Sequence, residues 1–146
     1  MEELVHYGYS YIRKSLIKGV INSPYGRNKP LQGGLWTSPM NSEYGWKDYC
    51  KSEDHDADLG VYCTVTLKDD AKVLTIDGDD AKVPMIEKGV PHSRRKYPDF
   101  EEIAKHYDAI HLTAKGERET RFSDKLNFYG WDCETVLILN PDAIKE

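Results

Sequence analysis

The sequence predicts an α+β fold, with a compact, mixed and mainly antiparallel β-sheet and few short helices. Two observations support this class. Short runs rich in β-branched and aromatic residues recur along the chain, separated by turn-forming Gly, Pro, Asn and Asp. Runs with helical spacing are few, and they fall early and late. The chain has 146 residues, the length of one domain, so we expect residues 1–146 to share one core.

In the first part of the chain, residues 3–9 (ELVHYGY) predict a strand because they are short and rich in Val and Tyr. Residues 10–21 have apolar side chains at the spacing of an amphipathic helix, which Ser10 would cap and Gly19 would end. Residues 22–34 have the Pro, Gly and Asn content of a loop.

The middle of the chain predicts three strands and a helix. Residues 35–39 (LWTSP) form a short strand, and residues 42–53 form a helix or a helical turn. Residues 60–68 (GVYCTVTLK) alternate and are rich in β-branched side chains, which favours a strand. Residues 72–77 (KVLTID) are a further strand.

The last part of the chain contains the most apolar strand. Residues 100–107 place apolar side chains on one helical face, with Asp99 as the expected N-cap. Residues 108–113 (DAIHLT) predict a strand, and residues 116–132 predict a long polar loop with aromatic interruptions. Residues 134–141 (ETVLILNP) are strongly apolar, so we expect this strand at the centre of the sheet.

Composition limits the functional classes. The formal net charge is -5, whereas proteins that bind nucleic acid non-specifically are usually basic. No apolar run approaches the roughly 20 residues of a membrane span, and the first ten residues lack the apolar stretch of a signal peptide. Cys50, Cys63 and Cys133 are odd in number and have no CxxC spacing, as expected for reduced thiols. We therefore expect a cytoplasmic protein that does not contact membranes.

Two stretches place reactive side chains beside glycines. In HYGYS, the His6 imidazole could bond a ligand hydroxyl, while Gly8 would let a flat ring approach the backbone. In GGLWTSP, a pair of glycines ending at Gly34 precedes Trp36 and Ser38, which would offer an aromatic ring and a hydroxyl. Both stretches therefore have the composition of a site for a flat polar ligand.

A third stretch, GWDCETVLIL, places Asp132 and Glu134 at the start of the apolar last strand. Ionised carboxylates avoid low-dielectric surroundings unless they have a partner. This position is understandable if the carboxylate stabilises a positive charge that develops during a reaction.

The order of these motifs resembles the ADP-ribosyltransferase superfamily, in its histidine-containing branch of diphtheria-toxin-like enzymes and poly(ADP-ribose) polymerases. HYGYS would supply the histidine motif of the first strand, GGLWTSP the second segment, and ETVLILNP the strand that opens with glutamate. The resemblance implies a split sheet and an ADP-ribosyltransferase-like domain over residues 1–146. It also implies a mono-ADP-ribosyltransferase that uses NAD as substrate, releases nicotinamide and modifies a macromolecular acceptor. A protein is the expected acceptor, and a nucleic acid is the alternative.

The resemblance also implies roles for single residues in binding NAD. His6 would hydrogen-bond the ribose that carries nicotinamide, and the Gly8 backbone would face the nicotinamide amide. Trp36 would stack on the nicotinamide ring in place of the family's tyrosine, and Ser38 would lie near the ribose. The remaining expected contacts to NAD come from Tyr7 and Gly34.

In the same resemblance, the catalytic residues are Glu134, His6 and Asp132, with Glu134 as the central one. It would hold the ribose 2′-hydroxyl and stabilise the oxocarbenium-like charge that forms as nicotinamide leaves. Asp132 stands where the family has a first acidic residue and would face the incoming nucleophile. Two variants of this interpretation stay open. WTS could be the motif of the arginine-containing branch, with Arg13 or Arg27 as its arginine, or the chain could bind the ligand without catalysis.

Three interpretations outside this family also stay open. A zinc site between residues 50 and 63 has a spacing that fits no tight chelate, so we expect no metal. Its candidate ligands are Cys50, Asp54, His55, Asp56 and Cys63. A nucleophilic enzyme built on Cys133 and His111 lacks a context that lowers a thiol pKa. The strongest rival is a small cytoplasmic phage or mobile-element inhibitor that binds a partner, since ten tyrosines and three tryptophans suit an interface.

Overall fold

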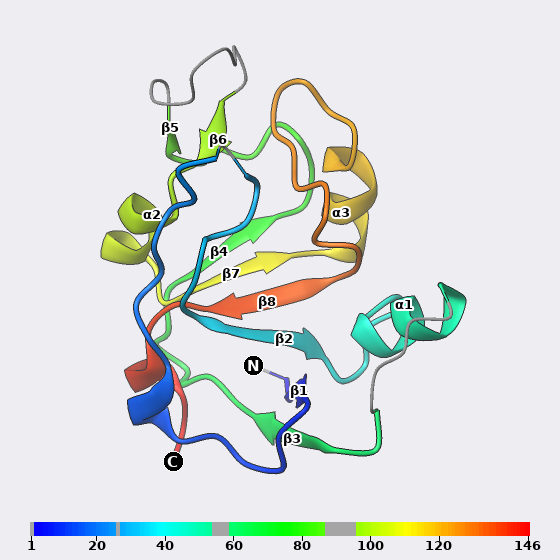
Figure 1. The fold of residues 1–146 in the computed structure, drawn as a ribbon, viewed down its shortest axis with the longest axis vertical. Coiled ribbons are helices and arrows are strands. Elements are labelled where there is room, and N and C mark those ends of the chain that lie inside the picture. The colour runs from blue at the N-terminus through cyan, green and yellow to red at the C-terminus, as the bar shows by residue number, and fades with distance from the viewer. Residues whose placement is uncertain (1, 26, 54–58, 87–95) are drawn as a thin grey trace.

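The computed structural model describes residues 2–25, 27–53, 59–86 and 96–146. Within them, six strands form one sheet in the order β3-β1-β2-β8-β7-β4, and β5 and β6 form a small second sheet (Figure 1). Neighbouring strands are antiparallel except β4 and β7, which are parallel. The predicted α+β class with a mainly antiparallel sheet is therefore confirmed.

The strands are β1 (Leu4–Tyr7), β2 (Leu35–Pro39), β3 (Tyr62–Val65), β4 (Val73–Ile76), β5 (Met85–Ile86), β6 (Tyr97–Pro98), β7 (Ala109–Leu112) and β8 (Thr135–Ile138). The helices are α1 (Trp46–Ser52), α2 (Phe100–His106) and α3 (Ala114–Thr120), with 3-10 turns η1 (Lys14–Leu16) and η2 (Pro141–Ala143). All six strands predicted from the sequence are confirmed, as are the helices expected within residues 42–53 and 100–107. The Asp99 carboxylate caps α2 by accepting a hydrogen bond from the main-chain N–H of Glu102.

The helix predicted over residues 10–21 is wrong, because only η1 forms there. Long-range hydrogen bonds hold this segment in an irregular path. The Gly34 N–H donates to the Lys18 carbonyl at 2.8 Å, and the Lys14 ammonium donates to the Ile144 carbonyl at 2.6 Å. These tertiary contacts replace the local hydrogen bonds that a helix would make.

The uninterrupted loop predicted over residues 116–132 is also wrong, since α3 occupies its first part. The Thr113 hydroxyl caps α3 by accepting a hydrogen bond from the Gly116 N–H at 2.9 Å. Gly116 lowers the intrinsic helix propensity of the segment. The structure needs glycine here because a Cβ would lie 2.1 Å from the Ile76 carbonyl oxygen.

Strand β8 lies between β2 and β7, and all four of its residues are buried, as predicted for the central strand. Its side chains alternate between two hydrophobic clusters, with Leu137 in one and Val136 and Ile138 in the other. Both faces of the sheet are therefore covered, which explains the continuous apolar run.

Two helices lie at the same end of the sheet (Figure 1). Helix α1 follows β2, helix α3 follows β7, and β8 begins there because it is antiparallel to both neighbouring strands. Helix α2 lies at the opposite end (Figure 1). The start of β8, with Asp132 and Glu134, is therefore placed between two helices.

The adjacent glycines before β2 serve the packing of the chain. Gly33 and Gly34 both have positive φ, at 92° and 74°. A Cβ on Gly33 would lie 2.2 Å from the Gly19 carbonyl oxygen, and one on Gly34 would lie 2.8 Å from Leu137 Cδ1. Glycine is required because the backbone approaches the rest of the chain closely.

Candidate functional site

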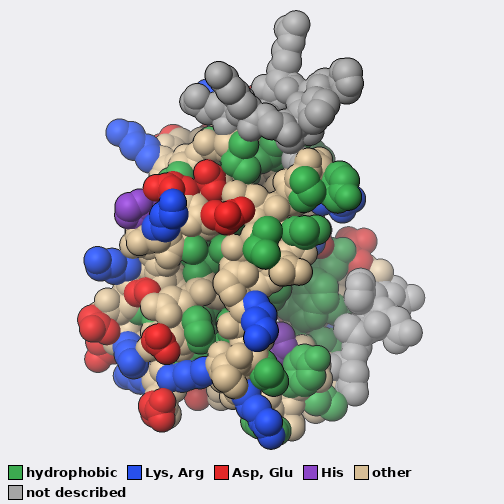
Figure 2. All heavy atoms as spheres, turned by 60° about the vertical axis from the view of Figure 1, so that its left-hand side comes forward, with side chains coloured by type: hydrophobic (Ala, Val, Ile, Leu, Met, Phe, Trp, Pro, Cys, Tyr) green, Lys and Arg blue, Asp and Glu red, His purple; other side chains and the backbone are tan. Residues whose placement is uncertain are grey.

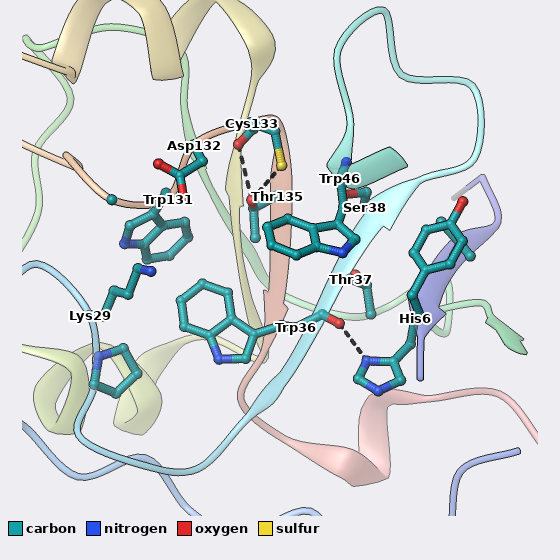
Figure 3. Close-up of a pocket in the computed structure, with 14 residues that line it drawn as sticks. His6, Lys29, Trp36, Thr37, Ser38, Trp46, Trp131, Asp132, Cys133 and Thr135 are labelled. Atoms are coloured by element: carbon teal, nitrogen blue, oxygen red, sulfur yellow. Dashed lines mark hydrogen bonds between the residues drawn. The ribbon is translucent and has the colours of Figure 1, made fainter. Parts of the chain in front are cut away.

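A cavity of about 420 Å³, here called the tryptophan cavity, opens beside strands β1 and β2. All three tryptophans of the chain line it, together with polar side chains and main-chain atoms (Figure 3). Its lining residues are Val5, His6, Tyr7, Lys29, Pro30, Trp36, Thr37, Ser38, Trp46, Gly130, Trp131, Asp132, Cys133 and Thr135. An aromatic cavity with a few polar groups has the usual composition of a small-molecule site.

The cavity is located where β1 separates from β2. The two strands pair only at Leu4 with Pro39 and at Val5 with Ser38. One residue further along, His6 Nδ1 lies 2.7 Å from the Trp36 carbonyl oxygen. Where the pairing of β1 with β2 ends, the His6 side chain thus bonds a main-chain carbonyl of β2. Both strands contribute residues to the cavity.

The hydrogen bond to Trp36 fixes the tautomer of His6. A carbonyl oxygen can only accept, so Nδ1 must carry a proton. In the neutral imidazole, Nε2 is then a hydrogen-bond acceptor, and it bonds none of the described residues. The imidazole also stacks on the Tyr9 ring with a centroid separation of 5.8 Å. Figure 3 shows His6 at one end of the group of cavity residues.

The aromatic rings of the cavity pack against one another. The Trp36 and Trp131 rings meet edge to face at 4.9 Å, and Trp131 packs in the same way on Phe128. The Trp131 indole N–H donates to the Asn28 carbonyl at 2.6 Å. Lys29 Nζ lies 6.0 Å from the centroid of the Trp36 ring, at the limit of a cation–π contact. The flat indole rings of the cavity therefore lie beside the Lys29 ammonium.

Asp132 supplies a carboxylate to the cavity from a strained turn. Its φ is 71°, the one positive value at a non-glycine among the described residues, and the Cys133 N–H donates to the Trp131 carbonyl at 2.9 Å. This hydrogen bond closes a γ-turn of the rare, strained type around Asp132. Backbone strain of this kind gathers at functional sites. The carboxylate makes no hydrogen bond or ion pair within the part of the chain that the structure describes.

Glu134 does not line the tryptophan cavity. Its carboxylate lines a separate depression beside α3, here called the α3 hollow. The residues of the α3 hollow are Glu43, Tyr44, Ala114, Glu117, Arg118, Arg121, Phe122 and Glu134. The resemblance would place His6, Trp36 and Glu134 around one NAD molecule, but Glu134 lines a different depression from the other two. Because the main chain turns sharply at Asp132, the two acidic residues lie in different depressions.

Both oxygens of the Glu134 carboxylate have partners. The Ser42 hydroxyl donates to Oε1 at 2.5 Å, and His111 Nε2 lies 2.7 Å from Oε2. Burial by itself would raise the pKa of Glu134, but the hydrogen bonds from His111 and Ser42 outweigh burial and leave the pKa below its usual value. Ser38 joins the two regions, because its hydroxyl donates to the Glu134 main-chain carbonyl at 3.1 Å.

The other residues predicted for the site divide between the cavity and its surroundings. Tyr7 and Ser38 line the tryptophan cavity, whereas Gly8 and Gly34 do not. The Gly8 N–H donates to the Val61 carbonyl at 2.8 Å. Lys29, Trp46 and Trp131 are among the lining side chains that sequence reasoning missed. For the tryptophans a signal was present, since the chain has only three of them.

The structure opposes the Cys133 nucleophile and does not describe most of the suggested zinc site. Burial raises the pKa of the Cys133 thiol to about 11, which opposes a nucleophilic role at neutral pH. His111 bonds Glu134 instead. Asp54, His55 and Asp56 of the suggested zinc site lie outside the described residues, and among those described no group of three His, Cys, Asp or Glu side chains could hold a metal ion.

No family model, no curated protein and no solved structure matches the chain. Among the described helices, none is long and apolar enough to cross a membrane.

Proposed function

We propose that this chain is an NAD-dependent mono-ADP-ribosyltransferase that binds NAD in the tryptophan cavity. One observation carries the proposal: flat indole walls, the Ser38 hydroxyl, one cation and one carboxylate all line the same cavity. Nicotinamide in NAD is a flat cationic ring, which favours the face of an indole such as Trp36. Lys29 would bind the diphosphate, and His6 would contact the ligand at the other end of the cavity.

In the proposed reaction, Asp132 takes the place that the family resemblance gave to Glu134. The bond between ribose C1′ and the nicotinamide nitrogen breaks, and its electron pair leaves with nicotinamide. Positive charge develops on the ribose, and the Asp132 carboxylate stabilises it. A lone pair of the acceptor then forms the new bond to C1′, and the acceptor's proton passes to Asp132. This assignment is supported by the position of Asp132 in the cavity and of Glu134 outside it.

The acceptor is macromolecular, and we place the activity in the cytoplasm because the three cysteines are free thiols. The experiment measures two quantities on the purified chain. Indole fluorescence should fall when NAD is added, since all three tryptophans line the cavity. Nicotinamide should be released when a cell extract supplies an acceptor. If millimolar NAD changes neither the fluorescence nor the melting temperature, the proposal is wrong.

A second candidate is favoured by a different observation. In the part of the chain that the structure describes, five aromatic side chains are more than 60% exposed, namely Tyr9, Tyr11, Tyr25, Phe122 and Tyr129. Exposed aromatic residues are typical of interfaces, so the chain could be an inhibitor that binds a partner without catalysis. A stable complex from a cell extract, formed by a chain that does not bind NAD, would favour this candidate.

A further inference from the structure

The segment between α3 and β8 carries two large aromatic side chains in solvent. Phe122 is 78% exposed and Tyr129 is 61% exposed, and their ring centroids lie 5.8 Å apart. Leaving two adjacent rings in water gives up the free energy that their burial would supply. Exposed apolar groups that gather in this way mark contact sites.

These two rings line a groove of about 300 Å³, here called the aromatic groove. Among the described residues that line it, the charged side chains are Lys96, Arg121, Lys125 and Asp124, and Arg121 pairs with Glu117 outside the groove. The described lining therefore holds more basic than acidic side chains, on a chain whose net charge is -5. On the face of the molecule that Figure 2 shows, basic and acidic side chains are interspersed.

The aromatic groove adjoins the tryptophan cavity along two chain segments. Asn28 and Tyr129 line the groove, and the next residues along the chain, Lys29 and Gly130, line the cavity. A Cβ on Gly130 would lie 3.4 Å from Lys29 Cε, so the two segments are in contact there. A ligand in the groove therefore lies next to the cavity.

We propose that the aromatic groove binds single-stranded nucleic acid. Bases stack on exposed rings such as Phe122 and Tyr129 whatever their sequence, and basic side chains bind the phosphates between them. Lys125 stands beside the rings for this purpose, whereas the Arg121 guanidinium already pairs with the Glu117 carboxylate. Because the rest of the chain is acidic, affinity depends on the groove itself. That the bound nucleic acid is also the acceptor of ADP-ribose rests on the proposed function.

A strand in the groove would place a base beside the tryptophan cavity. A ring nitrogen or exocyclic amine of that base would use its lone pair to form the bond to ribose C1′. The bond from C1′ to nicotinamide breaks with its electrons on nicotinamide, and the proton of the attacking amine passes to Asp132. No other reactant is needed for this transfer.

Binding can be tested without any reaction. A fluorescein-labelled oligonucleotide of about twelve nucleotides, as DNA and as RNA, is titrated with the chain and followed by anisotropy. We expect binding in about 50 mM salt that weakens in about 200 mM salt. Replacing both rings, as Phe122→Ser with Tyr129→Ser, should weaken binding at least about fivefold for each base that stacks. Lys125→Glu should weaken binding and reduce its salt dependence.

Matched controls separate the groove from general effects. Tyr11 is 62% exposed and lies outside the groove, so Tyr11→Ser should bind like the wild type. Lys51 is exposed on α1, so Lys51→Glu has the same charge change as Lys125→Glu at another place. The inference is overturned if the wild type binds neither oligonucleotide. It is also overturned if the ring variant binds like the wild type, or if a control loses as much affinity.

The acceptor assignment has its own measurement. The chain is incubated with NAD, the same oligonucleotide and cell protein, and the mass of each product is determined. A mass increase of one ADP-ribose on the oligonucleotide supports the assignment, and label on protein alone overturns it. If NAD is not consumed at all, the proposed function fails, while anisotropy still decides whether the groove binds nucleic acid.

Discussion

His111 Nε2 lies 2.7 Å from Glu134 Oε2, and this contact joins β7 to the start of β8. The side chains are 20% and 13% exposed, so the pair is mostly shielded from water. Ser42 holds the second carboxylate oxygen from the segment after β2. Glu134 therefore ties three parts of the chain together at the end of the sheet where α1 and α3 lie (Figure 1).

Glu134→Gln should lower stability and leave catalysis nearly unchanged. Glutamine keeps the shape but loses the charge that two hydrogen bonds satisfy, and we expect a loss of roughly 1–2 kcal/mol. Because the folded-state pKa lies below the ordinary 4.5, the carboxylate stabilises the fold above pH 4.5. That contribution disappears as pH falls through the folded-state pKa.

Urea unfolding of both proteins at several pH values measures this effect. The difference in unfolding free energy between wild type and Glu134→Gln should shrink at acidic pH. Nicotinamide release by the variant should stay within about threefold of wild type at neutral pH. A difference that is the same at every pH would contradict the role of the charge.

The sequence predicted the sheet better than the helices, for a physical reason. Strands β8 and β3 form within the predicted ranges 134–141 and 60–68, because apolar content and β-branching are local signals. Residues 10–21 have helical spacing but are held by hydrogen bonds from Gly34 and to Ile144, which no local pattern contains. Helix α3 was missed because Gly116 weakens its pattern, although that glycine is required for contact with β4.

The candidate site was predictable in part. His6, Tyr7, Trp36, Ser38 and Asp132 do line the tryptophan cavity. Whether Glu134 lines the tryptophan cavity or the α3 hollow depends on the γ-turn at Asp132. A positive φ at an aspartate cannot be read from residue type. The rarity of tryptophan marked Trp131 as a candidate, but its position could not be predicted because it depends on a hydrogen bond to the distant Asn28 carbonyl.

Gly33→Ala should be among the most damaging single substitutions in the chain. The new Cβ would lie 2.2 Å from a main-chain oxygen at a φ of 92°, and no side chain can move aside. We expect a loss of about 3 kcal/mol or more, measured by chemical denaturation. Gly8→Ala meets no atom within 4 Å and should cost only about 1–2 kcal/mol for its φ of 110°.

Gly19→Ala is the control for this series, because a Cβ there meets nothing and its φ is not positive. Its stability should lie within about 0.5 kcal/mol of wild type. If Gly33→Ala is as stable as Gly19→Ala, close backbone approach is not the reason for the glycine pair.

Lys29→Gln should weaken NAD binding without affecting nicotinamide. Of the described residues that line the cavity, Lys29 is the one lysine or arginine, and a diphosphate needs a cation. Its side chain is exposed, so we expect a loss of about fivefold that shrinks with added salt. Isothermal titration with NAD and with nicotinamide measures both affinities. Lys18→Gln, an exposed lysine outside the cavity, should bind NAD like the wild type.

Asp132→Asn should abolish most of the proposed activity while the fold is kept. Asparagine tolerates positive φ about as well as aspartate, so the γ-turn and the melting temperature should be preserved. The amide cannot stabilise the charge that develops on the ribose, and nicotinamide release should fall about a hundredfold to a thousandfold. NAD affinity should change much less, because the charge is needed in the transition state. Asp132→Gly relieves the strain of the φ of 71°. It should be as inactive as Asp132→Asn and at least as stable as the wild type. If Asp132→Asn keeps wild-type activity and Glu134→Gln loses it, Glu134 is the catalytic carboxylate and the cavity assignment is wrong.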